Sequence, residues 1–305
     1  MQYFLPRIKF ILFVFLICLI PLELLHYFDP TTKGNENYWA SIEDKHEVLN
    51  KTKAPRILIA GGSNMAFGIN SALIESDFDM PVINLAIHED LGLNFIAKEL
   101  EKNIQKGDVA ILGLEYQANN SGKTEAKGLA YKFAKDTDWS LGNFFFGIKS
   151  HAFNLFKSLL YYLGNYSESY NYKLLSRKNF NKKGDFEGHF GQNKLFILDS
   201  LTPIDDDFDS KISKLNKLNE SVLNKGATIY FVYPCLAESA FEKNYEILDN
   251  IHQELIKELK MPILGIPQDF VLDDGYFYDN IYHTDKKGRQ IRTSRLISLL
   301  EDTGL

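Results

Sequence analysis

Residues 56–64 read Arg-Ile-Leu-Ile-Ala-Gly-Gly-Ser-Asn, and this stretch decides the fold class. A short apolar run that ends in two glycines is typical of a buried strand followed by a tight turn. Residues 82–85 (VINL) and 109–114 (VAILGL) have the same character, and a helical pattern lies between them at about 93–105. This spacing indicates βαβ units, in which parallel strands alternate with helices.

The second half of the chain continues the alternation. An amphipathic helix is expected over about 212–225, and a strand follows it at once at 228–232 (TIYFV). A helix over about 241–259, a short strand near 262–266 and a last helix over roughly 287–300 complete the pattern. We therefore expect an α/β domain with a parallel sheet and helices on both faces, and a ligand site at the carboxyl ends of the strands.

The N-terminus carries a membrane signal. Arg7 and Lys9 precede an apolar run from Phe10 to Ile20, which continues to Leu25. Because positive charge before such a run favours the cytoplasm, we expect residues 1–28 to be a cytoplasmic stub and one transmembrane helix. The main domain would then lie outside the cytoplasm, in the periplasm or outside the cell. A cleaved signal peptide is the alternative, but no small-residue cleavage site follows the run.

Composition divides the rest into a stalk, a domain and an insertion. Residues 29–54 are polar and are expected to form a stalk with a short helix near 42–49, whereas residues 55–305 form the α/β domain. Between about 117 and 200 the alternation stops and aromatic residues are dense. We expect an aromatic-rich helical insertion there, either a cap with its own small core or a lid that forms a substrate groove or rests on a bilayer.

Charge and motif content exclude several classes of function. The formal net charge of −6 gives no basic patch for a phosphate backbone, so no nucleic acid partner is expected. The two cysteines and seven histidines are not spaced as a metal site, and neither glycine-rich phosphate-binding motif occurs. We therefore expect neither a metal nor a cofactor.

Three residues carry the candidate chemistry. Ser63 follows the first strand and the turn at Gly61 and Gly62, which is where reactive groups lie in this architecture. Asp279 and His283 share one loop before the last helix. A serine nucleophile needs a base, and the base needs an acceptor that fixes its tautomer, so this loop can supply both. A plain helix cap remains the alternative role for Ser63.

In combination these motifs resemble the SGNH (GDSL-like) hydrolase superfamily, over roughly residues 56–300 without the insertion. The resemblance implies a three-layer, flavodoxin-like fold and a Ser63, His283 and Asp279 triad. Where that family reads Gly-Asp-Ser, this chain has Gly62 before the serine. The second block, residues 84–92 (NLAIHEDLG), would supply the backbone N–H of Gly92 to an oxyanion hole.

The third block departs from the family pattern. The family places an asparagine side chain in the oxyanion hole there, whereas residues 113–116 read GLEY, with Glu115 in the corresponding region. Asn64, Asn119 and Asn120 are the candidates to compensate, and Asn64 is the one we assign together with Gly92.

The last block is similar to the branch of membrane-linked polysaccharide O-acetyltransferases. That similarity implies acyl transfer to a cell-surface glycan, with a membrane acyltransferase partner that delivers the acyl group. An exported carbohydrate esterase or deacetylase would use the same residues. A glycan-binding component without catalysis is the third interpretation.

Overall fold

The computed structural model describes residues 4–28, 37–123, 174–194 and 208–305, together with short pieces between 126 and 163. Its central sheet has five strands in the order β2-β1-β3-β4-β6, and every pairing in it is parallel. The strands are β1 (Ile57–Gly61), β2 (Val82–Asn84), β3 (Val109–Gly113), β4 (Thr228–Val232) and β6 (Ile263–Leu264). A separate parallel pair joins β5 (Leu236–Ala237) to β7 (Val271–Leu272). The predicted parallel α/β sheet is confirmed.

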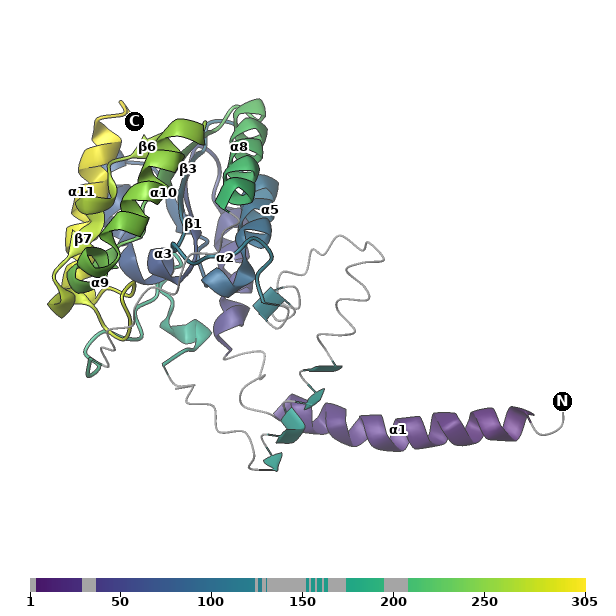
Figure 1. Ribbon diagram of the computed structural model, residues 1–305. Coiled ribbons are helices and arrows are strands. Elements are labelled where there is room, and N and C mark those ends of the chain that lie inside the picture. The colour runs from purple at the N-terminus through teal and green to yellow at the C-terminus, as the bar shows by residue number, and fades with distance from the viewer. Residues whose placement is uncertain are drawn as a thin grey trace.

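Helices cover both faces of this sheet (Figure 1). One layer contains α2 (Ser41–Lys51), α5 (Leu93–Asn103) and α8 (Phe208–Asn224). The other contains α3 (Ser63–Gly68), α4 (Ser71–Phe78) and α11 (Lys286–Glu301), and α11 contacts both α3 and α4. Helix α10 (Tyr245–Glu258) adjoins α8, because Nδ2 of Asn216 donates a hydrogen bond to the carbonyl oxygen of Glu258. The short helix α9 (Glu238–Lys243) packs against the β5–β7 pair. The helix expected over 241–259 is thus two helices, which meet at Asn244.

The register of the two central strands sets the position of the site. Gly61 at the end of β1 lies opposite Gly113 at the end of β3. Because parallel strands end at the same edge of the sheet, the residues that follow them leave side by side. Ser63 and Glu115 stand at matching positions beyond the two glycines, and their side chains therefore meet at this edge.

Residues 37–54 belong to the folded domain, which corrects the expectation of a polar stalk. Tyr38, Trp39, Ile42 and Leu49 are buried and join the hydrophobic core of the sheet domain. The Tyr38 hydroxyl also donates a hydrogen bond to the carbonyl oxygen of Ile87 at 2.7 Å. The predicted helix is present as α2. Its apolar residues could not be recognised as part of the core from the sequence, because the residues around them are mostly polar.

Helix α1 (Phe4–Phe28) lies apart from the sheet domain in Figure 1. Within the described residues, no helix combines the length and the apolar character that crossing a membrane requires. The expected transmembrane helix is therefore not supported.

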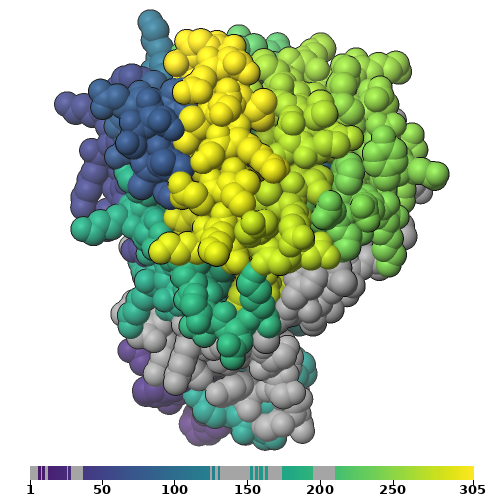
Figure 2. All heavy atoms as spheres, turned by 90° about the vertical axis from the view of Figure 1, so that its left-hand side faces the viewer, coloured from purple at the N-terminus to yellow at the C-terminus, as the bar shows by residue number. Residues whose placement is uncertain are grey.

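The described part of the insertion region packs against the C-terminal helix. Figure 2 shows segment 174–194 directly below α11 on one face of the molecule. Arg289 of α11 contacts Asp185 at 3.4 Å and Glu187 at 3.1 Å, and these pairs join the two elements. Most of the aromatic-rich stretch, and with it the expected cap or lid, lies outside the described residues.

Candidate active site

Ser63 lies at the carboxyl edge of the sheet, in contact with two glutamates. It is the first residue of α3 and its side chain is buried, with 2% of the residue exposed. The Ser63 hydroxyl lies 3.2 Å from Oε2 of Glu89 and 3.3 Å from Oε1 of Glu115. Glu89 starts the short 3₁₀ helix η2 (Glu89–Leu91), which follows β2. The serine is thus presented by β1 and the two carboxyl groups by its neighbours β2 and β3.

Glu115 is buried against the turn that carries the serine. Its Oε1 accepts a hydrogen bond from the N–H of Asn64 at 2.8 Å, whereas its Oε2 is buried without a hydrogen-bond partner. Gly62 allows this approach, because a Cβ on that residue would overlap the carboxyl group. Glu115 therefore occupies the region in which the sequence predicted an oxyanion hole.

The surroundings of Glu115 favour its neutral form. Burial raises the pKa of Glu115, and repulsion from Glu89 adds to that effect, so that the pKa reaches about 7. The hydrogen bond from the Asn64 N–H opposes the shift. A carboxyl group with this pKa exchanges its proton near neutral pH, where it can both donate and accept hydrogen bonds.

Asp279 and His283 form the pair that the sequence predicted. Nδ1 of His283 lies 2.8 Å from Oδ1 of Asp279 and 2.9 Å from Nδ2 of Asn280. Burial alone would raise the pKa of Asp279, but the charge of His283 and the hydrogen bond to it lower the pKa overall. The carboxylate is therefore ionised at neutral pH and suited to hold an imidazolium.

Packing brings the His283 ring close to the helix that carries the serine. The ring stacks on Phe67, with ring centroids 3.9 Å apart and an interplanar angle of 12°. Ser63 and Phe67 are one helical turn apart and lie on the same face of α3. Among the hydrogen bonds of the described residues, however, none joins Ser63 to His283, because the hydroxyl is directed to the glutamates.

The structure gives the two predicted oxyanion residues other contacts. The N–H of Gly92 donates to the carbonyl oxygen of Glu89 at 2.8 Å, so this group is already used. The N–H of Asn64 donates to Glu115, and its Oδ1 accepts from Nη2 of Arg292 at 2.9 Å. Asn64 follows Ser63 directly and Gly92 follows the short helix that carries Glu89, but neither backbone N–H is free in this arrangement.

Asn119 and Asn120 hold a neighbouring loop through hydrogen bonds that do not involve Ser63. Oδ1 of Asn119 accepts from the N–H of Gly122, and Nδ2 of Asn120 donates to the hydroxyl of Ser210. Their carbonyl oxygens accept from the first residues of α5. They anchor this loop to α5 and α8, and they are not placed to compensate for the missing third-block asparagine.

Sequence reasoning missed Arg292 and His189. Arg292 is fully buried on α11. It lies one turn before Leu296 and two turns before Leu300, which are also buried, and this spacing was the signal in the sequence that could have placed Arg292 on the buried face of the helix. Nε2 of His189 lies 2.9 Å from the carbonyl oxygen of Thr284, next to the loop that carries Asp279 and His283. Burial lowers the pKa of His189 to about 4, although the contact with Thr284 opposes the shift. It is therefore neutral and fixes the position of this loop.

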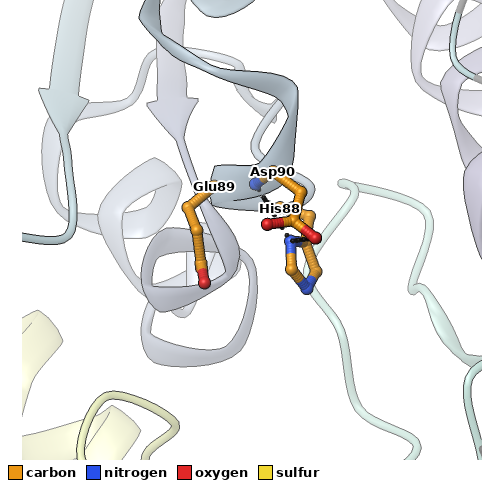
Figure 3. A group of neighbouring side chains, drawn as sticks. All are labelled: His88, Glu89 and Asp90. Atoms are coloured by element: carbon orange, nitrogen blue, oxygen red, sulfur yellow. Dashed lines mark hydrogen bonds and ion pairs between the residues drawn. The ribbon is translucent and has the colours of Figure 1, made fainter. Parts of the chain in front are cut away.

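Among the residues that the structure describes, His88, Glu89 and Asp90 form a group whose possible metal-ligand atoms all lie within 4.8 Å of one another (Figure 3). In this view His88 and Asp90 turn toward each other, whereas Glu89 points to the other side. Asp90 pairs with Nζ of Lys123 at 2.9 Å, and Nδ1 of His88 accepts from the Asp90 N–H at 3.1 Å. Because these side chains already have protein partners, we assign them no metal.

No protein-family model matches the chain, and no curated protein is significantly similar to it. Function is therefore argued from the site itself.

Proposed function

We propose that this chain is a serine acyl-ester enzyme of the SGNH type, with Ser63 as nucleophile, His283 as base and Asp279 as the residue that orients the base. The observation that carries the proposal is the 2.8 Å contact between His283 and Asp279. The same ring stacks on Phe67, one helical turn from the serine. A serine, a histidine and an ionised aspartate at the carboxyl edge of a parallel sheet are the groups that acyl transfer through serine requires.

The reaction begins when the Ser63 hydroxyl turns from the glutamates to Nε2 of His283. His283 takes the proton, and the serine oxygen attacks the carbonyl carbon of an acyl ester. The leaving oxygen then takes the proton from His283, and an acyl-enzyme remains on Ser63. Water or a sugar hydroxyl resolves it by the reverse sequence of proton transfers.

Transfer of an acetyl group to a hydroxyl of a cell-surface polysaccharide is the reaction that the resemblance implies, with a membrane acyltransferase partner as acyl source. Hydrolysis by an exported carbohydrate esterase uses the same residues and is the alternative. A location outside the cytoplasm remains a prediction from the sequence, and the chemistry at Ser63 does not depend on it.

One observation favours a second candidate, a glycan-binding protein without catalysis. The Ser63 hydroxyl is hydrogen-bonded to Glu89 and Glu115 and not to His283. In a binding protein this arrangement would be permanent, whereas in an enzyme the hydroxyl must turn to the base during turnover.

The test compares the purified full-length chain with its Ser63→Ala variant. Each is incubated with p-nitrophenyl acetate, with and without an oligosaccharide, and acetylated sugar is measured by mass spectrometry. Ser298→Ala is the matched control, because Ser298 is exposed on α11. Nitrophenol release that only Ser63→Ala abolishes supports the enzyme, and acetylated sugar identifies transfer. Equal release by both serine variants would leave the binding protein as the better account.

A further inference from the structure

The hydroxyl of Ser63 lies against one carboxyl oxygen of Glu89 and one of Glu115, and a single proton is available for these two contacts if both glutamates are ionised. A serine hydroxyl has a single proton to donate. The Ser63 oxygen nevertheless lies 3.2 Å from Oε2 of Glu89 and 3.3 Å from Oε1 of Glu115. Both contacts can be linear hydrogen bonds at the same time only if one of the carboxyl groups also bears a proton.

Burial indicates that the additional proton belongs to Glu115. Glu115 is 2% exposed, whereas Glu89 is half-buried and can be solvated. Oε2 of Glu115 has no hydrogen-bond partner. An ionised carboxylate with one buried, unpartnered oxygen would lose its hydration without replacement, and a neutral acid avoids most of that cost.

The charged and titratable groups around Glu115 come from three other elements. Glu89 of η2 repels a negative charge on it, and burial holds the neighbouring His88 largely neutral by lowering its pKa. Tyr282, from the loop before α11, has a pKa raised well above its ordinary value by burial. The guanidinium of Arg292 is the nearby positive group, and its Nη2 donates to Oδ1 of Asn64. These contacts leave Glu115 with a pKa of about 7.

We propose that Glu115 acts as a carboxylic acid that donates a hydrogen bond to the oxyanion formed when Ser63 attacks an acyl ester. This inference rests on the serine chemistry proposed above. Oε1 of Glu115 is next to the serine oxygen, so it faces the place where negative charge develops. A carboxylate there would repel that charge, whereas the acid stabilises it.

The acid takes no part in the covalent balance of the step. The serine proton passes to His283, the bond between the serine oxygen and the acyl carbon forms, and the carbonyl electron pair moves to the oxyanion. The O–H bond of Glu115 stays intact throughout. When the oxyanion collapses, the bond to the leaving oxygen breaks and that oxygen takes the proton from His283.

The pH dependence of kcat/KM for p-nitrophenyl acetate tests this role. For the full-length chain, Ser63-dependent kcat/KM should fall about tenfold for each pH unit above about 7, as Glu115 loses its proton. Glu115→Gln keeps a neutral donor, so it should retain kcat/KM within about fivefold at pH 6 and lose the alkaline decline. Glu115→Ala removes the donor, so its kcat/KM should be about 10²-fold below that of the parent at pH 6 and should lack the alkaline decline. Glu246→Gln, at an exposed position on α10, is the matched control and should follow the parent chain.

A spectroscopic titration reports the proton without turnover. The infrared carbonyl band of a neutral carboxylic acid should disappear as the pH rises through 7 and should be absent in Glu115→Gln. A missing band at pH 6, or parent activity that does not decline up to pH 9, would overturn the acid role. So would a folded Glu115→Gln chain with more than about 100-fold lower kcat/KM at pH 6. Absence of any Ser63-dependent release would instead overturn the proposed enzyme.

Discussion

The carboxyl group of Glu115 fills the space that a side chain on Gly62 would occupy. A Cβ on Gly62 would overlap both carboxyl oxygens. The φ angle of Gly62 is −88°, a value that any residue adopts, so backbone conformation does not demand glycine here. The glycine before the serine is needed because a buried acidic side chain from the neighbouring strand lies against it.

Substitution Gly62→Ala should therefore be costly only while Glu115 is present. We expect it to lower the free energy of unfolding by about 2 kcal/mol, because the added methyl group forces the carboxyl group and α3 apart. In a Glu115→Ala background the same change should cost less than about 1 kcal/mol. Urea denaturation of the four proteins of this cycle measures both values. Equal costs in the two backgrounds would show that another contact requires the glycine.

The two residues beside Nδ1 of His283 should differ in their effect on catalysis. Oδ1 of Asn280 accepts from the N–H groups of Tyr282 and His283, so its amide group serves the turn. Asp279 is the acceptor that can hold a protonated imidazole. We expect Asp279→Asn to lower kcat by about 10³ or more, and Asn280→Ala by less than about tenfold. Steady-state kinetics with p-nitrophenyl acetate measure kcat of both variants. A larger loss of kcat in Asn280→Ala than in Asp279→Asn would assign the orienting role to the amide.

The raised pKa of Glu115 also predicts how stability depends on pH. A carboxyl group with a folded-state pKa near 7 and an ordinary value of 4.5 contributes most to stability below pH 4.5. That contribution is lost as the pH rises toward 7, because the unfolded chain releases the proton first. Relative to Glu115→Gln, the parent chain should lose roughly 2–3 kcal/mol of unfolding free energy over this range. Denaturation curves at pH 4.5, 6 and 7.5 measure the difference, and a constant difference would contradict the shift.

Lys45 should be a strong determinant of stability although it is a lysine. Its buried ammonium group donates to the carbonyl oxygens of Asn84 at 2.8 Å, Ala86 at 2.9 Å and Gly184 at 2.6 Å. Burial lowers the pKa of Lys45 to about 7, although these acceptors still use all three N–H groups of the charged form. Lys45→Met would leave three buried acceptors without a donor and should cost about 3 kcal/mol.

The matched control for that change is Lys51→Met in the same helix. Lys51 is exposed and pairs with Glu47, a contact worth only a few tenths of a kcal/mol. Urea denaturation should therefore separate the two variants clearly. Equal midpoints would show that the carbonyl oxygens around Lys45 find other donors.

Local sequence patterns were sufficient to predict most of the helices and strands, and also the Asp279 and His283 pair of the candidate site. Buried strands such as β1 and β3 are continuous apolar runs with a charged residue before them and glycine at their ends, and such runs stay recognisable in the sequence. Asp279 and His283 lie in one short loop, so their contact follows from closeness along the chain. The helix α2 was assigned to a stalk because its buried contacts are made to residues far away in the sequence.

The sequence by itself determined the alternation of strands and helices, the position of Ser63 after the first strand, and the Asp279 and His283 pair. Only the tertiary structure decided that Glu89 and Glu115 meet at the serine hydroxyl, that the Gly92 N–H is used within its own turn, and that Arg292 is buried beside Asn64. The physical reason is the distance along the chain between the residues that interact. Strands and turns depend on neighbouring residues, whereas the meeting of Ser63 with Glu115 depends on the register of two strands that are brought together only when the sheet forms.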